Sequence, residues 1–192
     1  MARLPGIRGV IIGTTGRGRG LDDPELSGVW SALEAHGMVA FIHPHYGLGN
    51  DQFGGFGHSL FLALGFPFET TAAVARLILA GTLDRHPALK LLVAHSGGCL
   101  PFLAGRLNSC VEGEPALAAS LEKKPSEYLK QLYYDAVIYG TPQMEMVHDL
   151  VDGDACVATA SRCARTRRRA LTPTPSALSR IPLPPRARCA AR

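Results

Sequence analysis

Two histidines end apolar runs that are typical of buried β-strands. His43 ends the run MVAFIH and His95 ends the run LKLLVAH, and each leads into a loop that contains Gly or Pro. In parallel α/β folds the chemistry lies at the carboxyl ends of strands, because the loops there vary without disturbing the core. Neutral imidazole binds metals and transfers protons near neutral pH. Although one such histidine alone is more often structural, the pair predicts a metal-assisted or proton-transfer site.

The other polar motifs carry weaker signals. His45 repeats the spacing of a strand His-x-His pair, but Pro44 ends the strand, so a ligand role is the less favoured interpretation. The glycines after His95 and those of residues 13–20 lack the spacing of a P-loop or a dinucleotide fingerprint. Tight turns explain both better than phosphate binding. Arg106 lies three turns past His95 on an expected helix, where a single arginine is usually solvated or ion-paired.

Alternating strand and helix patterns must position these histidines. The expected strands lie in residues 7–13, 38–43, 89–95 and 132–138, and the expected helices lie in residues 21–37, 69–81, 100–111 and 141–153. Nearly continuous apolar strands with helical crossovers predict an α/β fold with a parallel sheet covered by helices. The pattern leaves open whether the sheet is doubly wound or barrel-like.

The composition changes abruptly after Asp154. Nine of the 20 basic residues lie beyond it, with no acidic residue among them, so residues 1–154 carry a net negative charge. We therefore predict one domain over 1–154 and a disordered Arg/Ala/Pro-rich tail over 155–192. A nucleic-acid partner inferred from the overall charge of +4 would rest on this tail alone, so none is predicted.

No membrane span or signal peptide is expected, because Gly, His or charged residues interrupt the apolar runs and the first residues lack an apolar segment. A cytoplasmic protein is therefore predicted. Its five cysteines are irregularly spaced and form no CxxC pair. They indicate neither a disulfide framework nor a cysteine-type zinc site.

Three segments together resemble a known family. FIHPHYGLGN, the block AHSGG with PF and GR after it, and YYDAVIYG are similar to the 2-amino-3-carboxymuconate-6-semialdehyde decarboxylase family of the amidohydrolase superfamily. The resemblance covers about residues 6–154. It is nearest to the fungal uracil-5-carboxylate and 6-methylsalicylate decarboxylases.

This resemblance implies a (β/α)8 barrel with a divalent metal, usually Zn²⁺ or another ion such as Mn²⁺, and nonoxidative loss of carbon dioxide from a small carboxylic acid. By the resemblance, His43 is a metal ligand and His95 transfers the proton beside the metal. Arg106 matches an arginine that holds a substrate carboxylate in the neighbouring subunit's pocket, which implies a homodimer. Asp135 matches a recurring position that we interpret as structural.

The sequence departs from the family pattern at both ends. Nothing before residue 7 supplies the first-strand His-x-His pair, and no GTD aspartate follows the last strand. The chain therefore resembles about strands four to seven of the barrel, truncated on both sides, which predicts impaired activity. A non-catalytic remnant or interaction fragment is the main alternative, and a metal-dependent hydrolase of the amidohydrolase type is the lesser one.

Overall fold

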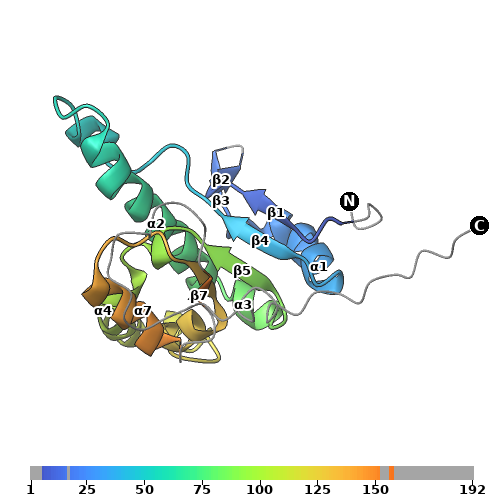
Figure 1. Ribbon diagram of the computed structural model, residues 1–192. Helices are drawn as coiled ribbons and strands as arrows, with labels where there is room; N and C mark the ends of the chain where they lie inside the picture. Colours follow the sequence, from blue (N-terminus) through green and yellow to red (C-terminus); the bar gives the residue numbers. More distant parts are fainter. Residues whose placement is uncertain (1–5, 17, 152–155, 158–192) are drawn as a thin grey trace, which may run out of the picture.

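The computed structural model describes residues 6–16, 18–151 and 156–157. Five parallel strands form its main sheet, and a two-stranded antiparallel hairpin lies beside it (Figure 1). The sheet strands are β1 (Gly9–Ile12), β4 (Val39–Ile42), β5 (Lys90–Val93), β6 (Tyr133–Asp135) and β7 (Cys156–Val157), and the hairpin strands are β2 (Thr15–Gly16) and β3 (Arg19–Gly20).

Helices connect the strands and cover the sheet. The α-helices are α1 (Ser27–Ala35), α2 (Phe66–Leu79), α3 (Thr82–Arg85), α4 (Leu100–Glu112), α5 (Pro115–Ala118), α6 (Pro125–Tyr128) and α7 (Thr141–Leu150). Short 3-10 turns are η1 (Pro24–Leu26), η2 (Asn50–Gln52), η4 (His95–Gly97) and η5 (Leu129–Gln131), and η3 (Phe61–Gly65) is a π-helical turn that runs directly into α2.

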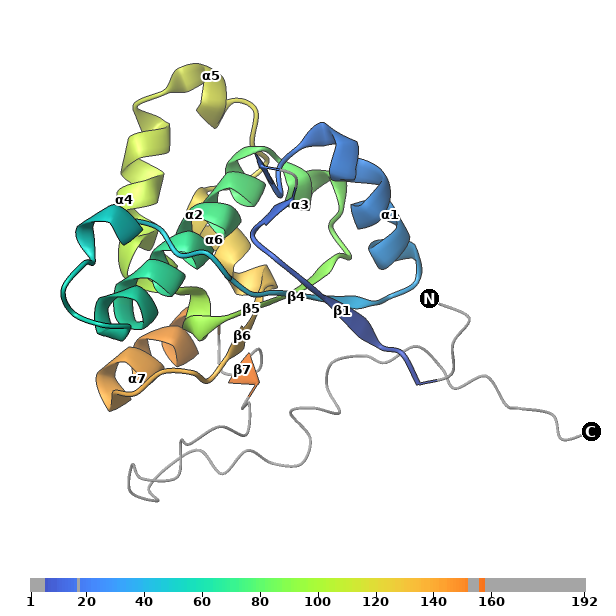
Figure 2. The same ribbon diagram turned by 90° about the horizontal axis from the view of Figure 1, so that it is seen from above.

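The strand order in the main sheet is β1-β4-β5-β6-β7, so each strand pairs with the next sheet strand along the chain. In a doubly wound sheet the spatial order of successive strands reverses at a switch point, whereas in a barrel each strand is added on the same side of the one before it. The order therefore favours the barrel-like alternative, and it confirms the predicted parallel α/β class. Figure 2 shows α1, α2 and α3 on one side of the sheet.

The two faces of the sheet differ in burial. Alternate residues Ala40, Ile42, Leu91 and Val93 are fully buried in the core that includes the helices. On the other face, the register aligns one row of four residues across the strands: Ile11, Phe41, Leu92 and Tyr133. Ile11 in this row is 75% exposed. One face thus packs against helices, and the apolar row of the other face is partly uncovered.

Local signals explain the helix starts. Asp23 accepts a hydrogen bond from the backbone N–H of Glu25 at 2.9 Å, and Pro24 is the first residue of the turn that follows. The structure places a 3-10 turn there, ahead of α1. Thr141 followed by Pro142 has the sequence pattern of a helix cap, but Gly140 occupies the cap position of α7 and Thr141 is its first helical residue.

Helix α2 and the preceding π-turn form a segment, Phe61–Leu79, that is long and apolar enough to cross a membrane by length and composition. The sequence reasoning missed this because it placed the helix start at residue 69. Within the segment, Val74, Leu77 and Ile78 are buried in the core. Packing accounts for these three residues, whereas Leu62, Leu64 and Phe68 near the start of the segment are exposed.

The sheet extends past the predicted domain boundary. Strand β7 lies within residues 155–192, where only an irregular tail is predicted, and it pairs in parallel with β6 through Cys156 and Val157. A two-residue strand is too short to show a period of its own, so its pairing depends on the neighbouring strand. The rest of the predicted tail, 158–192, lies outside the described residues.

Candidate active site

His43 and His95 meet at the carboxyl edge of the sheet. His43 directly follows β4, and His95 comes two residues after β5, which is the neighbouring strand. Their ring centroids are 5.4 Å apart with an interplanar angle of 53°. The expectation that both imidazoles project from the same edge of the sheet is met, because parallel neighbours end at the same edge.

The His43 ring is oriented by the chain that follows it. Its Nδ1 lies 2.7 Å from the carbonyl oxygen of Pro44. A carbonyl oxygen only accepts, so Nδ1 donates in this contact, and in the neutral tautomer with the proton on Nδ1 the lone pair is on Nε2. A histidine whose second nitrogen is held in this way is well suited to bind a metal through Nε2.

The His95 ring is held differently. Its Nδ1 is buried and has no hydrogen-bond partner among the described residues. Burial lowers the pKa of His95 from its ordinary value; the Asp135 carboxylate opposes this shift and the neighbouring His43 adds to it. The neutral imidazole is therefore favoured. A ring that titrates below its usual range releases a proton readily when charged.

Aromatic rings line one side of the histidine pair. The Phe66 centroid lies 5.9 Å from that of His95 and 6.2 Å from that of His43. Phe41 in β4 lies 5.7 Å from His43, and Phe61 lies 4.7 Å from Phe66. Because Phe66 is the first residue of α2, this helix contributes an apolar wall beside the two imidazoles. Such a wall is suited to a flat organic ring.

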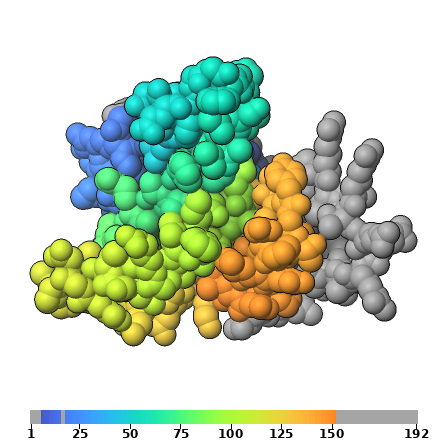
Figure 3. All heavy atoms as spheres, turned by 90° about the vertical axis from the view of Figure 1, so that its left-hand side faces the viewer, coloured from blue at the N-terminus to red at the C-terminus, as the bar shows by residue number. Residues whose placement is uncertain are grey.

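Arg106 is not part of this cluster. It lies exposed on α4 and makes no hydrogen bond or ion pair with any described residue. Figure 3 shows α4 next to α7 on one face of the molecule. The structure thus leaves the predicted carboxylate-binding role of Arg106 untested.

A buried carboxylate that the sequence reasoning missed organises the loop after His43. Glu69 in α2 is 5% exposed and accepts hydrogen bonds from the hydroxyl of Thr14 and from the backbone N–H groups of His45, Tyr46 and Gly47. The signal was present: Glu69 precedes the buried Ala73 and Leu77 by one and two helical turns, on the apolar face of α2. His45 itself is exposed and is not part of the histidine pair.

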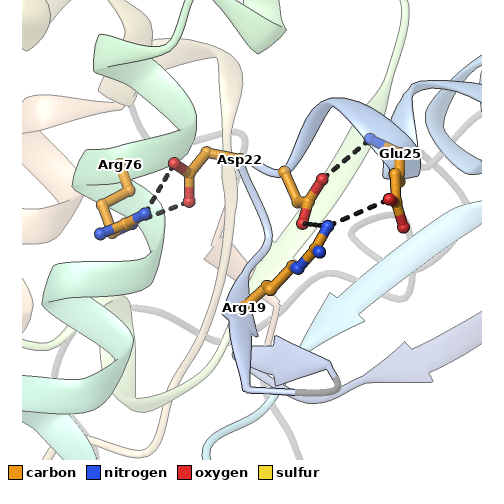
Figure 4. Close-up of polar contacts among 5 residues, drawn as sticks. Arg19, Asp22, Glu25 and Arg76 are labelled. Carbon is orange, nitrogen blue, oxygen red and sulfur yellow. Dashed lines mark hydrogen bonds and ion pairs between the residues drawn. The ribbon is translucent and has the colours of Figure 1, made fainter.

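A separate cavity lies away from the histidine pair. It has a volume of about 740 Å³ and lies between the β2–β3 hairpin and α2, where Thr14, Glu69 and Arg76 contribute to its wall. Neither His43 nor His95 lines it. Beside it Arg76 makes a two-pronged ion pair with Asp22, with both nitrogen–oxygen distances at 2.8 Å (Figure 4). These side chains already satisfy one another, so the cavity gives no clear ligand chemistry.

The histidine pair fits a divalent metal in part. The described residues contain no group of three or more His, Cys, Asp or Glu side chains that could hold a metal ion. His43 and His95 offer two nitrogens at most, whereas a catalytic zinc usually has about three protein ligands. The described part of the chain therefore supplies only part of a metal site.

A parallel sheet whose strands follow one another in sequence, with histidines at adjacent carboxyl ends, has the architecture of part of a (β/α)8-barrel enzyme. Comparison with known proteins identifies the family. The chain belongs to the amidohydrolase family, whose family model matches residues 1–163.

Curated relatives include decarboxylases. The chain is 31% identical over 147 residues to 2-amino-3-carboxymuconate-6-semialdehyde decarboxylase of Dictyostelium discoideum. This alignment covers 76% of this chain and 40% of that protein. It is 27% identical over 115 residues to 6-methylsalicylic acid decarboxylase of Penicillium expansum, covering 59% of this chain and 35% of that protein. These matches confirm the predicted resemblance.

Solved structures share the fold. The apo crystal structure of IDCase from Metarhizium anisopliae matches with a TM-score of 0.78 and 42% identity, over 88% of this chain and 47% of that one. A dihydroxybenzoic acid decarboxylase from Polaromonas, solved with bound manganese, matches with a TM-score of 0.66 and 20% identity, over 79% of this chain and 49% of that one. The chain spans less than half of the length of each of these four relatives.

Proposed function

We propose that the protein is a metal-dependent, nonoxidative decarboxylase that acts on a small carboxylated aromatic or pyrimidine acid, such as 6-methylsalicylate or uracil-5-carboxylate. The observation that carries this proposal is the juxtaposition of the His43 and His95 rings, 5.4 Å apart, next to the Phe66 ring. Similarity to a curated decarboxylase over 76% of the chain supports the reaction class.

The reaction sets two requirements. Loss of carbon dioxide breaks the bond between the ring carbon and the carboxyl carbon, and the electron pair stays on the ring carbon. That carbon must receive a proton, and the developing negative charge must be stabilised. We assign the proton transfer to His95 and the packing of the substrate ring to Phe66. A divalent cation such as Zn²⁺ or Mn²⁺, held by His43 Nε2, would stabilise the negative charge.

Arg106 is assigned to the substrate carboxylate, in the pocket of a neighbouring subunit of a homodimer. Its exposed guanidinium makes no hydrogen bond or ion pair with the described residues, so it is available for a bidentate pair with a carboxylate. In a chimera with a longer relative, mixing an Arg106→Ala subunit with a His95→Asn subunit should restore some activity, because the mixed dimer keeps one intact site. Size-exclusion chromatography would measure the dimer, and cell fractionation would test the cytoplasmic location that we propose with it.

A chimera gives the sharpest test of the chemistry. Residues 1–157 of this chain would replace the matching part of the Metarhizium anisopliae IDCase chain, and carbon dioxide release from the two acids would be measured with Zn²⁺ or Mn²⁺. In an active chimera, His95→Asn should keep the metal and lower the rate by about a hundredfold or more, the scale of a positioned acid or base. His43→Ala should remove the metal, and metal analysis would show this.

His36→Ala is the matched control, because His36 is an exposed histidine at the end of α1. It should leave both metal content and rate unchanged. Full activity of the His95→Asn chimera would exclude His95 from the mechanism. The isolated 192-residue chain should release little or no carbon dioxide, because its described residues hold too few metal ligands.

The same shortage of ligands favours the alternative function, a non-catalytic or interaction fragment. A folded chimera that binds metal but releases no carbon dioxide from either acid would support this alternative. It would contradict the assignment of His43 and His95 to catalysis.

A further inference from the structure

The turn that carries His95 has an unusual backbone. His95, Ser96, Gly97 and Gly98 have successive φ angles of 54°, 52°, 83° and 62°. Glycine adopts this left-handed region freely, but His95 and Ser96 do not, and the cost for an L-residue is about 1–2 kcal/mol. Two such residues in sequence persist only where the surrounding contacts hold them.

Two of these contacts come from Asp135 at the end of β6. One oxygen of its carboxylate accepts the backbone N–H of Ser96 at 2.9 Å and that of Val137 at 3.1 Å. The hydroxyl of Ser96 donates to the Asp135 carbonyl oxygen at 2.8 Å. Asp135 is only 2% exposed, and Ser96 is equally buried, so water does not compete for these bonds.

Helix α2 holds the other end of the turn. The N–H of Cys99 donates to the hydroxyl of Thr71 at 2.8 Å, and that hydroxyl donates to the carbonyl oxygen of Pro67 at 2.6 Å. Gly98 lies so close to Pro67 and Thr71 that a Cβ atom would overlap both. The turn is thus held between two elements, and Asp135 holds the residue next to His95.

The imidazole of His95 has no comparable restraint of its own. Its buried Nδ1 has no hydrogen-bond partner among the described residues, whereas Nδ1 of His43 is bonded to Pro44. The direction of the His95 ring is therefore set by the backbone conformation of the turn and by packing against Phe66.

We propose that Asp135 is a positioning residue for His95, acting through Ser96. The carboxylate holds Ser96 in the left-handed region, and this conformation aims the His95 ring at His43. The inference rests on the proposed function only in assigning His95 to proton transfer. The positioning itself is a property of the folded chain.

The ring-to-ring nuclear Overhauser effect between His43 and His95 measures this positioning in the isotope-labelled 192-residue chain. Asp135→Asn keeps a carbonyl oxygen that accepts the Ser96 N–H, so the cross-peak should remain. Asp135→Ala removes the acceptor, and the cross-peak should fall severalfold in a chain that is still folded by amide dispersion. Asp84→Ala is the matched control, since it removes a carboxylate bonded to the Tyr128 hydroxyl and should leave the cross-peak unchanged.

A merely stabilising role would lower the melting temperature of Asp135→Ala but keep the cross-peak in the folded chain, and that result would overturn the proposal. So would the absence of the cross-peak from the unaltered chain. If Asp135→Ala does not fold, Ser96→Ala provides the test, because alanine keeps the strain of an L-residue at this φ angle and removes only the hydroxyl bond to Asp135. Its cross-peak should weaken, and an unchanged cross-peak would contradict the role of Ser96.

The chimera separates this inference from the proposed function. Asp135→Ala should there lower kcat by about tenfold or more with little change in KM, and Asp135→Asn should recover most of the rate. An inactive chimera with the expected cross-peaks would refute the decarboxylase and leave the positioning intact. An active chimera whose kcat is the same with Asp135→Ala would refute the positioning alone.

Discussion

Glu69 gives the most direct test of how the loop after His43 is held. Its carboxylate, 5% exposed, accepts four donors: the hydroxyl of Thr14 and the N–H groups of His45, Tyr46 and Gly47. One oxygen receives Thr14 and His45, and the other receives Tyr46 and Gly47. Replacing Glu69 by glutamine keeps the size of the side chain and turns one of these acceptors into a donor.

The expected loss follows from the bonds that become unfavourable. If the oxygen that receives Tyr46 and Gly47 is replaced, two backbone donors face an NH₂ group; if the other oxygen is replaced, the N–H of His45 faces it while the Thr14 hydroxyl can turn and accept. A hydrogen bond to a charged group contributes about 1.5–3 kcal/mol, and an unsatisfied buried donor costs a similar amount. His45 and Tyr46 are exposed residues, so water can replace part of the loss there. We therefore expect Glu69→Gln to lower the free energy of unfolding by about 2–3 kcal/mol, or the melting temperature by about 4–12 °C.

Thermal melting and urea denaturation, followed by circular dichroism, would measure the effect of Glu69→Gln. Thr14→Val removes one of the four donors and should cost about 1 kcal/mol. Glu145→Gln on the exposed surface of α7 is the matched control and should change the stability by less than about 0.5 kcal/mol. A loss below about 1 kcal/mol for Glu69→Gln would refute the view that this carboxylate organises the loop.

Three further outcomes follow from the packing. Leu77→Ala, at a fully buried position, should cost about 2–5 kcal/mol in urea denaturation, and a smaller loss would contradict its place in the core. Gly98→Ala should cost at least about 1 kcal/mol, because its φ of 62° disfavours an L-residue and the new methyl group meets Pro67; an unchanged melting temperature would exclude this close contact. Burial, and then the hydrogen bond to Asp84, raise the pKa of Tyr128 to about 12, so Asp84→Asn should lower it in an absorbance titration. Since the folded pKa lies above the unfolded value of about 10, the contribution of Tyr128 to stability is full below pH 10 and is lost as the pH rises towards 12. A pKa of Tyr128 that Asp84→Asn leaves unchanged would contradict the contact between the two side chains.

The sequence predicts the pairing of His43 and His95 because two local regularities suffice. Apolar runs locate the strands β4 and β5, and parallel neighbours end at the same edge of the sheet. Helices α1, α2, α4 and α7 follow equally from their apolar spacing and from the prolines near their starts, although the first turns of two of them differ from the prediction. Local patterns thus yield both the architecture and the two imidazoles.

The contacts that hold the turn of His95 and the loop after His43 are long-range, so local sequence patterns do not predict them. Ser96 and Asp135 are 39 residues apart in the sequence, and Thr14 and Glu69 are 55 apart. Until the fold is known, the sequence does not show which acceptor a given backbone N–H will bond to. The left-handed conformation of Ser96 is also unexpected, since sequence patterns predict that region for glycine.

The described part of the barrel nevertheless holds the His43 and His95 rings in place by its own contacts. The His43 ring is bonded to the adjacent Pro44 carbonyl, and the turn of His95 is held by Asp135 and Thr71, all within the five described strands and their helices. The uncovered apolar row on the sheet faces what would be the interior of a closed barrel, where strands from the opposite side pack in related folds. Closing the barrel would therefore cover this row without having to reposition either imidazole. For this reason the chimera with a longer relative is the form in which the histidine pair should show its activity.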